Sequence, residues 1–275
     1  MKKYAVIGQP SKHSLSPRIH SEFAKDAGID ISYEAIEMSP ENFEQEIIKL
    51  FKRGYSGLNV TLPLKELAFN YADEISQMGI EAGAVNTLWK DKDKIFADST
   101  DGKGFAKDLF NNQISLKDKE LLILGAGGAS RSIIPSIINL QPKKITLLNR
   151  TFERASDLAE RLGSKGVAID ALRADEIPQG KVEGVINTTS AGLTGGNFIF
   201  NPKIFKEINW VYDLSYSKEA TPFIELAKNL GVKRRFDGLG MLVNQAAASF
   251  QIWTGIEPVS YTHLRAHETR HDLVC

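Results

Sequence analysis

Short apolar runs alternate with amphipathic stretches along most of the chain. Residues 4–8 and 33–36 are apolar runs of strand length, and the stretches after them repeat apolar positions every three or four residues, as helices do. The alternation resumes at residues 121–124 and continues to residue 235. Strands that alternate with helices predict an α/β fold with parallel strands.

One strand of this pattern ends in a glycine-rich turn. The turn is Gly125-Ala126-Gly127-Gly128-Ala129, and an apolar helical stretch follows it. Gly125 suits a tight turn, and Gly127 leaves room for the backbone to approach a pyrophosphate at the helix N-terminus. Ser130 stands where the dinucleotide-binding pattern usually has a third glycine, so the turn alone does not identify a cofactor.

The next strand, residues 144–148, ends in Asn149-Arg150-Thr151, with Arg154 one helical turn further on. NAD-binding proteins usually place an acidic residue here to hold the ribose 2′-hydroxyl, whereas an arginine suits a 2′-phosphate. Two guanidinium groups on one helix face could converge on one phosphate. Because the glycine turn lies at the right distance upstream, we favour this interpretation over solvated surface arginines and predict NADP as the cofactor.

Composition narrows the class of protein. The 275 residues contain 34 Lys and Arg against 34 Asp and Glu, a formal net charge of +0, which gives no reason to expect a nucleic acid or membrane partner. The length suits two domains of about 100 to 150 residues each, and we expect a small-molecule partner and a monomer or homodimer. The only cysteine is Cys275, so we predict no metal site built from a cysteine cluster, and we expect no metal site elsewhere. No apolar run approaches the length of a membrane span, so we predict a cytosolic protein.

Polar residues interrupt the apolar strand at residues 57–62. Asn59 and Thr61 share one face of this strand, and Lys65 follows on the first turn of the next helix. Parallel strands buried on both faces are normally apolar, so these residues indicate a polar ligand at the end of the strand; an edge strand with a solvated lysine is the alternative. A lysine at a helix N-terminus suits proton donation.

Other features have local structural explanations. Ser16 could be a helix N-cap followed by Pro17, Asp101 could cap the helix that it precedes, and Gln245 could be a surface residue. The polar loop after residue 187, which contains Thr188, is either a plain turn or a place where a dinucleotide passes.

Spacing also predicts three elements outside these motifs. Apolar positions at Leu67, Tyr71, Ile75 and Met78 predict one helix, and residues 84–89 and 94–98 predict an antiparallel pair. A last helix is expected to pack through Leu242, Ala246, Phe250 and Trp253.

Residues 259–275 break this organisation. Three histidines there have helical spacing, but the segment lacks an apolar face and resembles translated read-through of a sequencing adaptor. We interpret it as a non-native tail and assign it no function.

Seven motifs together are similar to those of bacterial shikimate dehydrogenases, in the family's order and spacing as far as Pro258. They are Ser14-Leu15-Ser16-Pro17, Asn59-Val60-Thr61-x-Pro63-x-Lys65, Ala84-Val85-Asn86-Thr87, Thr100-Asp101, Gly125-Ala126-Gly127-Gly128-Ala129, Asn149-Arg150-Thr151 and Gly238-Leu239-Gly240-Met241-Leu242-x-x-Gln245. The resemblance implies reversible NADPH-dependent reduction of 3-dehydroshikimate to shikimate, on the route to chorismate and the aromatic amino acids.

The resemblance also implies domains and site residues. It implies an α/β substrate domain at 1–101, a doubly wound Rossmann domain for NADP at 102–237 and a returning helix at 238–258. Lys65 and Asp101 would be the catalytic pair. Substrate would be held by Ser14, Ser16, Asn59, Thr61, Lys65, Asn86, Asp101, Tyr216 and Gln245. Cofactor would be held by Gly125, Ala126, Gly127, Gly128, Ala129, Asn149, Arg150, Thr151, Arg154, Thr188, Gly238 and Met241.

Two alternative functions stay open. A quinate/shikimate dehydrogenase paralogue would accept an extra ring hydroxyl and often NAD, but Arg150 and Arg154 without an acid oppose an NAD preference. A non-catalytic NADP-binding regulator would not need Lys65 and Asp101 together.

Overall fold

The computed structural model describes residues 1–258 except residues 13, 164–165, 192–197 and 199. The chain divides into two compact units. The first unit contains Met1–Lys107 and the chain from Leu242 on, and the second is Asp108–Met241. The predicted tail, residues 259–275, lies outside the described residues.

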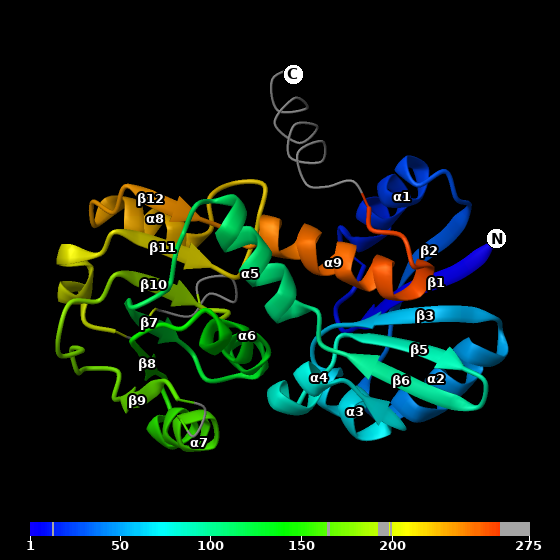
Figure 1. Ribbon diagram of the computed structural model, residues 1–275, viewed down its shortest axis with the longest axis horizontal. Coiled ribbons are helices and arrows are strands. Elements are labelled where there is room, and N and C mark those ends of the chain that lie inside the picture. Colours follow the sequence, from blue (N-terminus) through cyan, green and yellow to red (C-terminus); the bar gives the residue numbers. More distant parts are fainter. Residues whose placement is uncertain (13, 164–165, 192–197, 199, 259–275) are drawn as a thin grey trace. The chain divides into compact units, whose positions relative to one another are not determined.

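A six-stranded mixed sheet forms the centre of the first unit, in the order β2-β1-β3-β5-β6-β4 (Figure 1). The strands are β1 (Lys2–Gly8), β2 (Ile31–Glu37), β3 (Tyr55–Val60), β4 (Glu74–Ile75), β5 (Thr87–Asp91) and β6 (Lys94–Asp98). Strands β1, β2 and β3 are parallel, and β5 is antiparallel to both β3 and β6, which confirms the predicted antiparallel pair.

Helices cover both faces of this sheet. They are α1 (Ser16–Asp26), α2 (Phe43–Lys52), α3 (Lys65–Tyr71), α4 (Gln77–Ala82) and α9 (Leu239–Thr254), with a 3₁₀ turn at Pro40–Asn42. Alternate residues of β1 face opposite sides: Ala5 belongs to the core cluster that contains α2, whereas Tyr4 stacks on Trp253 of α9. Helices α1 and α9 share a core that contains Phe23 and Phe250. The first unit therefore depends on residues from both ends of the described chain.

One predicted helix is wrong. Apolar spacing joined Leu67, Tyr71, Ile75 and Met78, but α3 ends at Tyr71 and Ile75 lies in β4. The backbone of this segment pairs with β6, and the Ser76 side chain then accepts a hydrogen bond from Gly79 N–H to start α4. Strand pairing with β6 outweighs the helical periodicity here, because it satisfies backbone groups that β6 would otherwise expose.

The second unit is a six-stranded parallel sheet in the order β12-β11-β10-β7-β8-β9 (Figure 1). Its strands are β7 (Glu120–Leu124), β8 (Lys144–Leu148), β9 (Ala168–Leu172), β10 (Gly184–Asn187), β11 (Trp210–Asp213) and β12 (Arg234–Phe236). Its helical elements are α5 (Asp101–Asn111), which begins in the first unit, α6 (Gly128–Asn139), α7 (Phe152–Gly163), α8 (Pro222–Asn229) and a 3₁₀ helix at Pro202–Glu207.

The strand order reverses between β7 and β10, as in a doubly wound dinucleotide-binding fold. Ligands of such folds bind outside the carboxyl ends of the strands at this reversal. The glycine-rich turn follows β7 and leads directly into α6, so the structure puts it at that point.

Candidate functional site

A lysine and an aspartate form an ion pair in the first unit. Lys65 is the first residue of α3 and Asp101 is the first residue of α5. Nζ of Lys65 lies 2.5 Å from Oδ2 of Asp101, and the two side chains are only 18% and 8% exposed. The alternative of Asp101 as a simple helix cap is therefore wrong, because its carboxylate is engaged by residues from other elements.

Asn86 orients this pair. Its amide nitrogen donates to Oδ1 of Asp101 at 3.0 Å, while its amide oxygen accepts a hydrogen bond from the backbone N–H of Thr100 at 2.8 Å. These two bonds fix which way the amide faces. The carboxylate of Asp101 is thus held by an amide on one oxygen and an ammonium on the other.

Gln245 joins the same network from α9. Its Oε1 accepts a hydrogen bond from the Asn86 amide at 3.0 Å, and the residue is 9% exposed. The alternative of a surface glutamine is wrong. It was based on apolar spacing, which cannot show that this face of α9 packs against polar side chains.

Asn59 connects a second part of the network. Its amide nitrogen donates to Ser249 Oγ at 2.9 Å, and its amide oxygen accepts from the Tyr33 hydroxyl at 2.8 Å. The sequence motifs do not include Ser249 or Tyr33, so neither residue is predicted from them. Ser249 lies one helical turn after Gln245, which is the one sequence signal that could have identified it.

Aromatic packing holds Tyr33 in place. Its ring stacks on His20 of α1 with centroids 4.2 Å apart. Burial lowers the pKa of His20 to about 3, and the nearby Asn59 side chain offsets only part of that effect. Burial raises the pKa of Tyr33 well above its usual value, while the nearby Ser16 side chain opposes this shift. Ser16 therefore lies within reach of the Asn59 part of the network.

The two serines of the first motif contact each other. The Ser14 hydroxyl donates to Ser16 Oγ at 3.1 Å and accepts from the Ser16 backbone N–H at 3.2 Å. Ser16 is already inside α1, and Leu15 holds the cap position without a side-chain hydrogen bond, so the predicted Ser16 cap is wrong. Pro17 does lie at the start of the helix.

Thr61 also differs slightly from its predicted place. It lies one residue beyond the end of β3, half-buried, with its methyl group against Gly8. Lysine, carboxylate, amide and hydroxyl groups thus gather in one unit, which suits a ligand with several hydroxyl groups. Among the described residues, no group of three or more His, Cys, Asp or Glu side chains could hold a metal ion.

A separate site lies in the second unit at the glycine-rich turn. Gly125 has φ +106°, and a Cβ there would come within 2.5 Å of Thr188 Oγ1. A Cβ at Gly127 or Gly128 would meet no atom within 4 Å. Ala126 and Ala129 are the small residues beside these glycines. The space over Gly127 and the free N–H groups at the start of α6 suit an anionic ligand.

Hydroxyl groups connect this turn to β10. Ser130 Oγ donates to the Gly125 carbonyl at 2.7 Å and lies 2.6 Å from Thr188 Oγ1. Thr188 follows β10, and its backbone N–H donates to the carbonyl of Leu124 at the end of β7. Ser130, at the third position of the glycine pattern, therefore links the turn after β7 to the loop after β10.

Asn149 connects the turn to the segment after β8. Its Oδ1 accepts from the Ala126 N–H at 3.2 Å, and its Nδ2 donates to the Thr151 carbonyl at 2.8 Å. Arg150 and Arg154 are exposed, and neither guanidinium pairs with another residue in the described part of the chain. Their cationic groups are available to an anion.

Three further predicted residues lie in the second unit. Tyr216 is half-buried in the loop after β11. Gly238 packs directly against the carbonyl of Leu214, and its N–H donates to the Ser215 carbonyl at 3.0 Å. Met241 is 9% exposed in α9. Only a glycine can make the approach seen at position 238.

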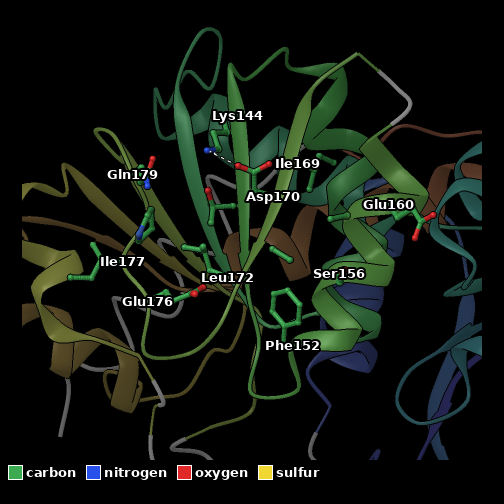
Figure 2. A pocket seen from close by; sticks show the side chains of 14 residues that line it. Lys144, Phe152, Ser156, Glu160, Ile169, Asp170, Leu172, Glu176, Ile177 and Gln179 are labelled. Atoms are coloured by element: carbon green, nitrogen blue, oxygen red, sulfur yellow. Dashed lines mark ion pairs between the residues drawn. The ribbon is translucent and has the colours of Figure 1, made fainter.

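A groove of about 750 Å³ lies at the β9 edge of the second sheet (Figure 2). Lys144 and Asp170 form an ion pair of 2.7 Å in it, and Phe152 and Ser156 line it from α7 (Figure 2). None of the predicted site residues lines this groove.

No helix within the described ranges is long and apolar enough to cross a membrane.

Three family models match the chain. They are the shikimate dehydrogenase substrate binding domain at residues 6–88, shikimate / quinate 5-dehydrogenase at residues 105–193 and the shikimate 5′-dehydrogenase C-terminal domain at residues 238–259. A curated relative from Actinobacillus succinogenes, named shikimate dehydrogenase (NADP(+)), is 44% identical over 260 residues, which cover 94% of this chain and 96% of the relative.

Solved structures agree with these matches. Shikimate dehydrogenase from Aquifex aeolicus has a TM-score of 0.86 and 34% identity, and the match covers 98% of both chains. The Thermus thermophilus shikimate 5-dehydrogenase in complex with NADP(H) and shikimate has a TM-score of 0.86 and 32% identity, covering 98% of this chain and 99% of that one.

Proposed function

Because the chain belongs to the shikimate dehydrogenase family, we propose that it catalyses the reversible NADPH-dependent reduction of 3-dehydroshikimate to shikimate. The single observation that carries this proposal for the chain's own residues is the Lys65–Asp101 ion pair inside a network of amides and hydroxyls. Reduction of a carbonyl needs a proton donor beside the oxygen, and a held ammonium group provides one.

Lys65 acts on the carbonyl oxygen in this proposal. NADPH supplies the hydride when bound, and negative charge then develops on the substrate oxygen. The Lys65 ammonium stabilises that charge and transfers a proton, which completes the alcohol; solvent then reprotonates the amine. Asp101 holds the ammonium in position through the 2.5 Å contact, while Asn86 holds Asp101.

Substrate recognition is assigned to the polar residues of the first unit. The ring hydroxyls and carboxylate of the substrate need several donors and acceptors of fixed orientation. We assign this role to Ser14, Ser16, Asn59, Thr61, Asn86, Asp101 and Gln245, and also to Tyr216 of the second unit. The hydrogen bonds described above support the assignment, because they hold the Asn59, Asn86 and Gln245 amides in defined orientations.

Cofactor recognition is assigned to the second unit. The pyrophosphate would lie over Gly127 and the start of α6, where a Cβ would meet nothing. The exposed Arg150 and Arg154 would hold the 2′-phosphate as bidentate donors. Where NAD-binding proteins usually have an acidic residue, after β8, this chain has Asn149 and Arg150. This difference supports NADP over NAD as the cofactor. Gly238, Met241 and Thr188 complete the proposed cofactor contacts.

A quinate/shikimate dehydrogenase is the second candidate, because one matching family description names both substrates. The regulator without catalysis has no supporting observation, since Lys65 and Asp101 are both present and paired. The cytosolic location and the monomer or homodimer state stay predictions.

The test is an absorbance assay at the NADPH band. Shikimate and quinate serve as alternative substrates, each with NADP or NAD. Turnover largely confined to shikimate with NADP supports the proposal. Comparable rates with quinate or NAD would favour the paralogue, and cofactor binding without any turnover would favour the regulator.

A further inference from the structure

The two halves of a dinucleotide lie on opposite sides of the strand reversal in a doubly wound fold. On the proposed function, Arg150 after β8 takes the 2′-phosphate on the adenosine side. The nicotinamide half would then lie on the other side of the glycine turn, toward the carboxyl ends of β10 and β11, which follow β7 in the strand order. Residues that hold the loops after β10 and β11 in place therefore affect how the nicotinamide half binds.

A buried carboxylate lies at this place. Asp213 is the last residue of β11 and is 2% exposed. Its Oδ1 accepts from Asn187 Nδ2 at 2.9 Å and from Ser215 N–H at 3.1 Å, and its Oδ2 accepts from the Thr221 hydroxyl at 2.5 Å. Burial raises the pKa of Asp213, while these donors oppose the shift.

The hydrogen bond between Asp213 and Asn187 connects the carboxylate to the loop after β10. Since the Asp213 carboxylate accepts hydrogen bonds, it orients the Asn187 amide with its nitrogen inward. The amide oxygen of Asn187 is then free to accept from the Thr189 N–H at 3.1 Å and the Thr189 hydroxyl at 2.7 Å. Between them lies Thr188, which contacts the glycine turn.

The hydrogen bonds from Ser215 and Thr221 connect the same carboxylate to the loop after β11. Ser215 and Thr221 flank Tyr216, and the Ser215 carbonyl accepts from the Gly238 N–H. Thr221 is also the N-cap of α8, with its hydroxyl oxygen accepting from the Ile224 N–H. One carboxylate therefore fixes both loops that border the expected nicotinamide position.

We propose that Asp213 is a positioning residue for the nicotinamide half of NADP, acting through the Asn187–Thr189 loop and the Ser215–Thr221 loop. This inference depends on the proposed function. Asp213→Asn removes the negative charge that strengthens all three of these hydrogen bonds, and its NH₂ group faces either Thr221, whose hydroxyl must then accept, or the two donors of Asn187 and Ser215. The loops would then be held more weakly.

The experiment compares two ligands on the full chain. NADPH contains both halves, whereas 2′,5′-ADP carries the adenosine phosphates without the nicotinamide. For Asp213→Asn we expect the dissociation constant of NADPH to rise about tenfold or more, while that of 2′,5′-ADP stays within about twofold of the wild type. Exposed Asp175→Asn is the matched control and should change neither value.

Arg150→Ala provides a contrasting control, because it should weaken the binding of both NADPH and 2′,5′-ADP. If Asp213→Asn does not fold, Asn187→Ser gives the same test, since it removes the attachment of the Thr189 loop and keeps the carboxylate. Equal losses for both ligands, or no loss for NADPH, would overturn the proposal. A wild-type protein that fails to bind NADPH would instead contradict the proposed function.

Discussion

Nζ of Lys65 lies 2.5 Å from Oδ2 of Asp101, although 36 positions separate the two residues in the chain. Each begins a helix, and Asn86 holds the second oxygen of the carboxylate. The ammonium group therefore has a fixed position, which a general acid needs.

Removal of that ammonium group should abolish most of the turnover. For Lys65→Ala we expect kcat to fall by about 10²-fold or more with a smaller change in KM, because the proton donor and the oxyanion partner are lost together. Steady-state kinetics with shikimate and NADP measure both constants. Lys117→Ala, at an exposed position, is the control. Near-normal turnover in Lys65→Ala would refute the assignment.

Two glycines of the same turn should respond differently to alanine. At Gly127 a Cβ meets no protein atom, so we expect a free energy of unfolding within about 1 kcal/mol of the wild type but at least about tenfold weaker NADPH binding. At Gly125 the positive φ and Thr188 predict a loss of about 1–3 kcal/mol of stability. Urea unfolding and NADPH fluorescence titration separate the two effects. Unchanged NADPH affinity in Gly127→Ala would contradict a pyrophosphate at that position.

The exposed arginine after β8 should control cofactor choice. For Arg150→Ala we expect kcat/KM with NADP to fall about tenfold or more, since a bidentate contact to phosphate is lost, while kcat/KM with NAD changes little. Arg53→Ala, which changes an exposed arginine after α2, serves as the control. An unchanged NADP-to-NAD preference would exclude the phosphate contact.

Buried His20 should make the fold sensitive to acid. Its pKa is about 3 in the folded protein, against a usual value of 6.5. Between these two pH values, His20 is therefore protonated in the unfolded chain and neutral in the native state. This contribution to stability is complete above about pH 6.5 and is lost as the pH falls toward 3. Between pH 7.5 and 4.5 the wild type should lose about 2–3 kcal/mol more than His20→Phe, whose ring can still stack on Tyr33. Equal losses in urea titrations of both proteins would show that His20 is not buried as a neutral group.

Much of the fold was predictable because its signals are local. Residues 120–151 carry a strand, a glycine turn, a helix and a second strand in consecutive order, and the structure has each of them. The antiparallel pair β5 and β6 was also predictable, since short apolar runs flank a charged turn.

The errors come from interactions between distant residues. Asp101 and Ser16 look like helix caps when only their neighbours are considered, and Gln245 looks exposed when only the periodicity of α9 is considered. Their actual partners are Lys65, Ser14 and Asn86. Apolar spacing predicts a helix at Ile75, because spacing alone cannot show that β6 lies beside this residue.

The return of α9 to the first unit affects how the chain can mature on the ribosome. Core residues Phe23 of α1 and Phe250 of α9 pack edge to face, and Asn59 depends on Ser249 for a hydrogen bond. A growing chain can complete the second unit first, because Asp108–Met241 leaves the ribosome before the rest of α9 does. The first unit, although synthesised earlier, must wait for the last helix. A chain truncated before residue 250 and released from the ribosome should therefore hold an assembled dinucleotide-binding unit and an incomplete amino-terminal core.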